Sequence, residues 1–148
     1  RKETDDPYLN AKEFMNSVEL DEEFQKQVIE IISSVSFKAN ETVTPKTIEG
    51  KIVQDADRLD AIGAIGIARA FAYGGHKNSL LYNPDEKPME NMDFEMYKKH
   101  RGSTINHFYE KLLKLKDMIN TETGRKIALV RDAFMKEFLA EFYKEWSE

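Results

Sequence analysis

The sequence predicts an all-α fold, and three observations support this prediction. Apolar residues recur at helical spacing in four separate stretches, whereas the alternating apolar and polar runs typical of strands are few. The 148 residues contain four prolines and seven glycines, so few positions interrupt a helix. The length fits one domain. We therefore expect residues 1–148 to form a single all-α domain, a bundle of about five to six helices.

The first third of the chain predicts two helices. A short helix is expected over residues 11–17. A longer helix is expected from Leu20 to Ile32, because apolar side chains recur at helical spacing, at Phe24, Val28, Ile31 and Ile32. The acidic residues 21–23 at its start suit the positive end of the helix dipole.

The longest helix is expected to begin at Thr44 and Pro45. Threonine caps helix N-termini, and proline suits the first helical position. We expect this helix to run to about Tyr73, where two glycines end it. The second half of its inner stripe contains small residues, which let another helix approach closely: Gly63, Gly66 and Ala70.

The C-terminal half predicts a loop followed by two helices. The polar region from His76 to Arg101 is expected to be a long loop with one helical turn near residues 92–97, and loops of this length often serve as mobile lids. A helix capped by Ser103 is expected to run to Asn120, with an inner face made of Ile105, Phe108, Leu112 and Leu115. The last helix follows Gly124 and ends near Trp146, forming either core or a homodimer interface. Its expected inner residues are Ile127, Val130, Phe134, Phe138 and Phe142.

Charge and composition exclude several classes of protein. The net charge is −5 and no long basic run is present, which argues against a general nucleic-acid binder. The absence of cysteine excludes disulfide scaffolds, thiolate metal sites and cysteine nucleophiles, and suits the reducing cytoplasm. The longest apolar stretch, residues 61–68, is far shorter than the roughly 20 residues of a membrane span. We expect a cytoplasmic protein without a membrane partner.

Three aspartates stand in the middle of the longest predicted helix: Asp55, Asp57 and Asp60. Aspartate has a low helix propensity, so its repetition there opposes local stability. Asp57 and Asp60 project about 60° apart, whereas Asp55 lies about 160° from Asp57 and cannot share a ligand cluster with it. Two interpretations remain open. Either Asp57 binds a divalent metal beside an acid–base group, or this face is solvated and Arg58 is a local ion-pair partner.

The residues around these aspartates resemble a known family. Residues 45–75, which include the run QDADRLDAIGAIGIARAF from Gln54 to Phe71, closely resemble the helix that carries the last metal ligand in HD-domain metal-dependent phosphohydrolases. Residues 103–115 and 121–124 resemble the same bacterial branch of this family. The resemblance therefore covers most of the chain.

The resemblance implies a helical bundle that binds one divalent cation through a histidine, a His-Asp doublet and a final aspartate. The final aspartate corresponds to Asp57. The other three ligands have no counterpart, because His76, His100 and His107 all follow Asp57 and none precedes an aspartate. We therefore expect the chain to be the C-terminal two-thirds of an HD domain, inactive alone, within a longer parent protein. The alternative is a catalytically inactive form.

In function, the resemblance implies hydrolysis of a phosphoester or pyrophosphate bond, with a nucleotide as the expected substrate. The cation would be Mn, Mg, Fe or Co. It would activate a water for attack, and nearby lysine or arginine side chains would neutralise the charge that grows on phosphate. The expected catalytic residues are Asp57, which is also the metal ligand, and Asp60. The expected substrate-binding residues are Arg58, Lys46, Lys111, Lys114 and His107.

Several of these candidates have a structural alternative. Arg58 either clamps phosphate or pairs with a neighbouring acid. Lys111 and Lys114 lie one helical turn apart and either bind phosphate or solubilise the helix. Asp60 either orients a ligand or water, or accepts a hydrogen bond from the backbone or an arginine. His107 either contacts substrate or is a structural or helix-capping group. For the whole protein, the alternatives are a non-catalytic helical binding or dimerisation module and a nucleotide sensor.

Overall fold

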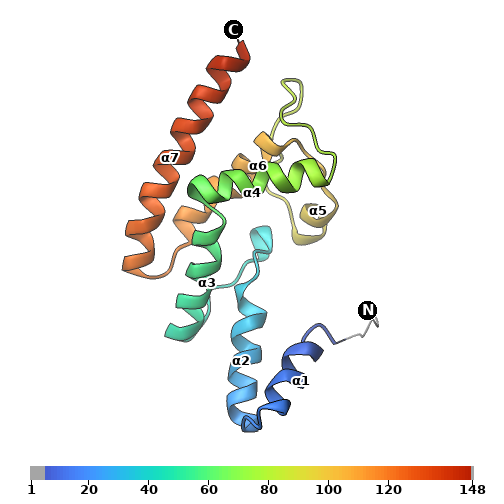
Figure 1. The fold of residues 1–148 in the computed structure, drawn as a ribbon, viewed down its shortest axis with the longest axis vertical. Coiled ribbons are helices and arrows are strands. Elements are labelled where there is room, and N and C mark those ends of the chain that lie inside the picture. Colours follow the sequence, from blue (N-terminus) through green and yellow to red (C-terminus); the bar gives the residue numbers. More distant parts are fainter. Residues whose placement is uncertain (1–5, 148) are drawn as a thin grey trace.

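The computed structural model describes residues 6–147, and every regular element in this range is helical. This confirms the predicted all-α class. The chain passes through seven α-helices and two short 3-10 helices in the described range (Figure 1): α1 (Leu9–Ser17), α2 (Glu22–Val35), η1 (Ala39–Glu41), α3 (Ile48–Asp60), α4 (Gly63–His76), α5 (Phe94–Lys99), α6 (Thr104–Glu110), η2 (Leu112–Met118) and α7 (Glu122–Ser147).

The hydrophobic core lies where α4, α6, η2 and α7 meet, and α7 runs along one side of the molecule (Figure 1). The sequence correctly predicted that one face of residues 105–115 is buried. The core consists of Ile62, Ile67, Ile105, Phe108, Leu112, Leu115, Ile119, Ala128, Met135 and Leu139. Burying these side chains supplies the main driving force for folding this half of the chain.

The long helix predicted from Thr44 to Tyr73 is wrong, because the chain bends between α3 and α4. The helix α3 begins after Thr47, whose side chain accepts a 3.1 Å hydrogen bond from the amide of Gly50. At the bend, Gly63 adopts a positive φ of 80°, which a side chain would strain. A Cβ atom on Gly66 would lie 2.2 Å from the carbonyl oxygen of Ala61, so this glycine permits the close turn.

The helix predicted from Ser103 to Asn120 is also divided. Ser103 caps α6 as expected, since its side chain accepts a hydrogen bond from the amide of Asn106. The α-helix ends at Glu110, and η2 continues with three residues per turn. This tighter winding places Leu112 and Leu115 on one face, and both side chains are buried.

The inner face predicted for α7 is rotated from the observed one. Ile127, Val130 and Phe134 are exposed, with 40 to 72% of their surface accessible. Phe138 and Phe142 do pack against the core, so they confirm part of the prediction. The buried positions of α7 are Gly124, Ala128, Asp132, Met135 and Leu139. Small residues at 124 and 128 bring the start of α7 close to its neighbours.

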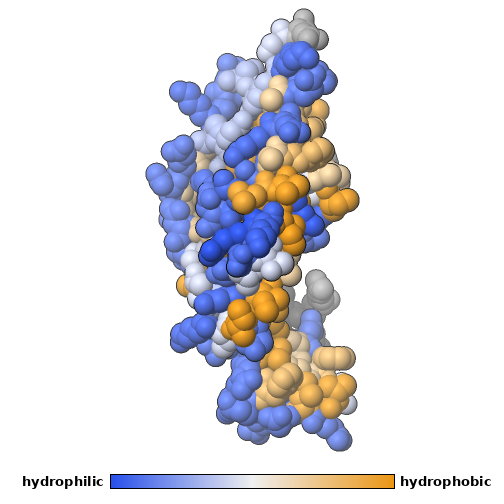
Figure 2. All heavy atoms as spheres, turned by 90° about the vertical axis from the view of Figure 1, so that its left-hand side faces the viewer, coloured by the Kyte–Doolittle hydropathy of each residue, from blue (hydrophilic) through white to orange (hydrophobic). Residues whose placement is uncertain are grey.

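The helices α1 and α2 form an arm that extends away from the core, and α2 contacts α1 and α3 (Figure 1). No residue of α2 is buried, although the helix is amphipathic. Hydrophobic side chains run down one side of the molecule from the level of α7 to this arm (Figure 2). None of the helices in residues 6–147 is long and apolar enough to cross a lipid bilayer.

Residues 77–103, here called the strap, connect α4 to α6. The strap begins as an irregular loop and then forms α5, which confirms the predicted long loop with one helical turn. Its first part is fixed to α6, because the carbonyls of Leu80 and Leu81 accept hydrogen bonds of 2.9 and 3.0 Å from the amides of Thr104 and Ile105. Whether it acts as a lid stays a prediction.

Candidate functional site

The inner face of α3 supports the fold. Asp55 is buried and accepts three hydrogen bonds at 2.7 to 2.8 Å, from the amide and side chain of Asn120 and from the amide of Thr121. Burial would raise the pKa of Asp55, but these hydrogen bonds together hold it below its usual value. Asp55 therefore stays charged and secures the chain just before α7.

Arg58 also lies on the inner face of α3. Its side chain is buried and donates a hydrogen bond to the carbonyl oxygen of Met118. Burial lowers the pKa of its guanidinium, while the charges of Asp55 and Asp57 oppose this effect. In this structure Arg58 joins α3 to η2, a structural contact whose partner is a backbone carbonyl and not the neighbouring acid considered from the sequence.

The outer face of α3 carries the two predicted catalytic acids. Asp57 is exposed and makes no hydrogen bond or ion pair with any of residues 6–147. Asp60 is exposed as well, but it forms an ion pair with Arg69 of α4. The same guanidinium donates a 3.3 Å hydrogen bond to the backbone carbonyl of Asp60. Asp60 thus orients Arg69, and Asp57 is left as a free carboxylate.

A cleft of about 750 Å³ lies between α4, α6 and the strap. Among the described residues that line it, Glu110 is the one carboxylate, and five side chains carry permanent positive charge: Arg69, Lys77, Lys98, Arg101 and Lys111. The protein as a whole has a net charge of −5. A cationic cleft in an acidic protein attracts anions, and phosphate groups are suitable ligands for such side chains.

Lys111 links Asp57 to this cleft. Burial lowers the pKa of Lys111, the negative charge of Asp57 opposes that effect, and the positive charge of Arg69 adds to it. Asp57 precedes Asp60 by about one helical turn on α3, and Arg69, the ion-pair partner of Asp60, lines the cleft together with Lys111. The Lys111 ammonium also stands 5.1 Å from the ring centre of Phe37, which helps to hold its side chain in place.

His107 lines the same cleft from α6. Burial, together with the charge of Lys111 and the nearby His100, lowers its pKa to about 4. The ring is therefore neutral at pH 7, with one nitrogen as a hydrogen-bond donor and the other as an acceptor. It makes no hydrogen bond to residues 6–147, so both nitrogens can serve a ligand.

The other predicted phosphate ligands lie elsewhere. Lys46 is exposed before the start of α3 and does not line the cleft. Lys114 lines a second cavity of about 160 Å³, together with Phe37 and Met92, on the other side of Glu110. The structure thus brings two of the five predicted ligands, Lys111 and His107, into one cleft.

Several basic residues of the cleft were not predicted. They are the cations Arg69, Lys77, Lys98 and Arg101 and the histidines His76 and His100. For Arg69 a sequence signal was available, because it lies within the segment that resembles the HD family. The others come from the strap and the end of α4, where no periodic pattern reveals which side chains meet.

The described residues do not by themselves form a complete divalent-metal site. In residues 6–147, no group of three or more histidine, aspartate or glutamate side chains is arranged to hold a metal ion. Asp57 can contribute one oxygen ligand, and its exposure leaves it free to do so. A stable site needs further ligands from elsewhere.

Known proteins resemble this chain closely, although no protein-family model matches it. A crystal structure of a Lactobacillus plantarum protein has a TM-score of 0.90 and 42% identity, over 97% of this chain and 70% of that one. An HD-superfamily hydrolase from Bacillus thuringiensis has a TM-score of 0.70 and 42% identity, over 98% of this chain and 65% of that one.

A third relative is the uncharacterised protein YpgQ of Bacillus subtilis. It is 44% identical over 121 residues, which are 80% of this chain and 51% of YpgQ. The crystal structure of YpgQ in complex with ADP has a TM-score of 0.67 and 39% identity, over 90% of this chain and 60% of that one. The chain spans about half the length of the curated relatives that it matches.

Proposed function

We propose that this chain, which belongs to the same family as the Lactobacillus plantarum protein and is related to the HD-superfamily hydrolase of Bacillus thuringiensis, forms the larger part of a metal-dependent phosphohydrolase domain. Its substrate is a nucleotide. The observation that carries the proposal is the free carboxylate of Asp57, about one helical turn from Asp60, whose ion-pair partner Arg69 lines a cationic cleft. The ADP complex of YpgQ supports a nucleotide as the ligand.

The cleft residues have separate roles in this proposal. Lys111 and Arg69 bind phosphate oxygens at the end of the cleft near Asp57, where the bond to be cleaved lies. They neutralise the negative charge that grows on phosphate during hydrolysis. His107 is neutral and donates a hydrogen bond without adding charge. Asp60 keeps Arg69 in position through their ion pair.

Asp57 is one ligand of the divalent cation, and we propose that the remaining ligands lie outside the described residues. The outer face of α3 supports this part of the proposal. Val53 precedes Asp57 by one helical turn and is exposed, whereas the exposed Ile48 and Ile52 lie on other sides of α3. An exposed apolar side chain beside a free carboxylate is suited to contact with further protein. The relatives are longer than this chain, so they contain residues that can supply that contact.

The proposal is tested by the variant Asp57→Asn in the intact protein, assayed for hydrolysis of nucleoside di- and triphosphates with Mn, Mg, Fe or Co. Loss of a metal ligand should lower turnover by about a hundredfold or more. The control is Asp85→Asn, which changes an exposed aspartate of the strap that makes no ion pair. It should retain full activity. Unchanged turnover in Asp57→Asn would contradict the proposal.

A helical binding or dimerisation module is the second candidate, and exposed apolar side chains on α7 favour it. Ile127, Val130 and Phe134 lie on its outer surface. Such a module would show no nucleotide turnover in the intact protein and would self-associate in sedimentation experiments. A nucleotide sensor would instead be stabilised thermally by the nucleotide without releasing product.

A further inference from the structure

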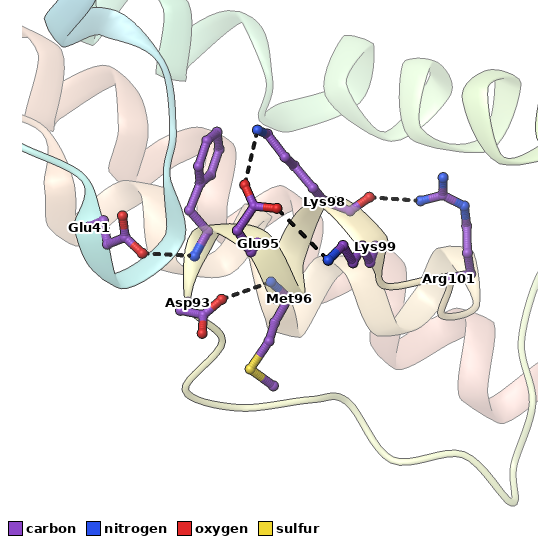
Figure 3. A network of polar contacts seen from close by, with 8 residues as sticks. Glu41, Asp93, Glu95, Met96, Lys98, Lys99 and Arg101 are labelled. Carbon is purple, nitrogen blue, oxygen red and sulfur yellow. Dashed lines mark hydrogen bonds and ion pairs between the residues drawn. The ribbon is translucent and has the colours of Figure 1, made fainter.

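The helix α5 forms part of one wall of the cationic cleft. Outside the strap it contacts residues 37–41, where the ring of Tyr97 meets that of Phe37 edge-on and the amide of Phe94 donates a hydrogen bond to Glu41. Its residues Tyr97 and Lys98, and the following His100 and Arg101, line the cleft. None of the six residues of α5 is buried. Its other polar contacts are mostly local and exposed (Figure 3). Asp93 caps the helix, Glu95 forms ion pairs with two lysines, and the Arg101 side chain donates a hydrogen bond to the carbonyl oxygen of Lys98.

Glu110 of α6 connects to the strap on both sides of α5. One carboxylate oxygen, Oε1, accepts a 3.0 Å hydrogen bond from the amide of Met89 and lies 2.9 Å from Nε2 of His100. Met89 precedes α5 and His100 follows it. The Glu110 side chain is 3% exposed and that of His100 is 16% exposed. A single buried oxygen therefore connects both ends of the α5 segment to α6. We call these two contacts of Glu110 the tie.

The carboxylate of Glu110 lines the cleft and repels an anion there, because both carry negative charge. Any favourable contribution of Glu110 to anion binding is therefore geometric. We propose that Glu110 is a positioning residue, which holds the α5 wall where Lys98 and Arg101 can reach a bound phosphate chain. This inference rests on the proposed function, since it assumes that the cleft binds phosphate.

The experiment separates position from charge by comparing Glu110→Gln with Glu110→Ala in the intact protein. Both variants lose the same charge, but glutamine retains an oxygen that can accept from Met89 and His100. The probe is inorganic tripolyphosphate, titrated by calorimetry. Glu110→Gln should bind it at least as tightly as the wild type. Glu110→Ala should bind it about three- to tenfold more weakly than Glu110→Gln, the range expected for one lost hydrogen-bond tie.

Matched controls use Glu90, an exposed carboxylate of the strap whose side chain makes no hydrogen bond or ion pair within residues 6–147. Glu90→Gln and Glu90→Ala should bind tripolyphosphate equally, because neither affects the tie. Hydrogen exchange should show loss of protection in residues 89–100 of Glu110→Ala, with α7 unchanged. If Glu110→Ala does not fold, Glu110→Asp replaces it. Aspartate keeps the charge, but its side chain is one methylene shorter and moves the oxygen away from Met89 and His100. Glu110→Asp should therefore bind tripolyphosphate more weakly than the wild type.

Two outcomes would overturn the inference. Equal affinities of Glu110→Gln and Glu110→Ala, or of Glu110→Asp and the wild type, would show that the tie does not position the wall, and would leave the proposed function intact. Failure of the wild type to bind tripolyphosphate would overturn both the phosphate cleft and the role of Glu110.

Discussion

The two faces of α3 carry aspartates only two residues apart, and their environments are opposite. Asp55 faces inward, is 3% exposed and accepts three hydrogen bonds at the start of α7. Asp57 faces outward and makes no hydrogen bond or ion pair within residues 6–147. A buried carboxylate is tolerated when its oxygens are satisfied by donors, and such a group serves stability. A carboxylate left free beside a cationic cleft is available for chemistry.

Among the variants of α3, Asp55→Ala is expected to cause the largest loss of stability. This change removes the acceptor for three hydrogen bonds and leaves the backbone amides of the half-buried Asn120 and Thr121 without this partner. The free energy of unfolding should fall by about 3–5 kcal/mol, which urea denaturation monitored by circular dichroism will measure. A loss of less than about 1 kcal/mol would show that the inner face does not depend on this carboxylate.

The bend after α3 fixes how both faces are presented, so its glycine is a second test. Gly66→Ala places a methyl group 2.2 Å from the carbonyl oxygen of Ala61, and that backbone atom has little freedom to move. We expect a loss of about 2–3 kcal/mol in the free energy of unfolding. Gly75→Ala is the control in the same helix, because a Cβ there meets nothing within 4 Å. Equal stability of the two variants would contradict the close turn.

The pH dependence of stability should also show that Asp55 is charged in the folded protein. Its pKa in the folded protein lies below the usual value of 3.8, so its charge stabilises the fold above that pH. The contribution is lost as the pH falls through the folded pKa. The difference in unfolding free energy between wild type and Asp55→Asn should therefore be constant near neutral pH and shrink below about pH 4. A difference that is the same at pH 7 and pH 3 would contradict this assignment.

The smallest expected effect on stability comes from the outer face. Asp57→Ala removes an exposed side chain that has no partner among residues 6–147, so the free energy of unfolding should change by about 0.5 kcal/mol or less. Alanine also favours the helix slightly. Thermal unfolding will measure the change. A loss of 2 kcal/mol or more, as roughly expected for a buried polar contact, would place Asp57 with Asp55 among the structural residues.

The sequence predicted the helical class and the buried face of residues 105–115, because periodicity reports which side of a helix is apolar. It did not predict the bend at Gly63, since a run of small apolar residues also fits a continuous helix and the positive φ of this glycine is visible only in the structure. It also misplaced the inner face of α7. That helix has more apolar residues than buried positions, and buried Asp132 interrupts the pattern.

For the candidate site, the sequence indicated Lys111 and His107, which lie in the resembling segment and in the cleft. It could not separate them from Lys46 and Lys114, because spacing alone does not show which lysine faces a cavity. The strap cations were missed for the same reason. Lys98 and Arg101 reach the cleft through the path of the strap and the tie to Glu110, which no local pattern encodes.

Our claim that Asp57 is a metal ligand is tested most directly by the metal content of the intact protein. Wild type, Asp57→Asn and Asp85→Asn would be purified side by side, dialysed against Mn, and analysed by plasma mass spectrometry. We predict about one bound cation per chain in the wild type and in Asp85→Asn, and a clear loss in Asp57→Asn. Equal metal content in all three proteins, or none in the wild type, would contradict the claim.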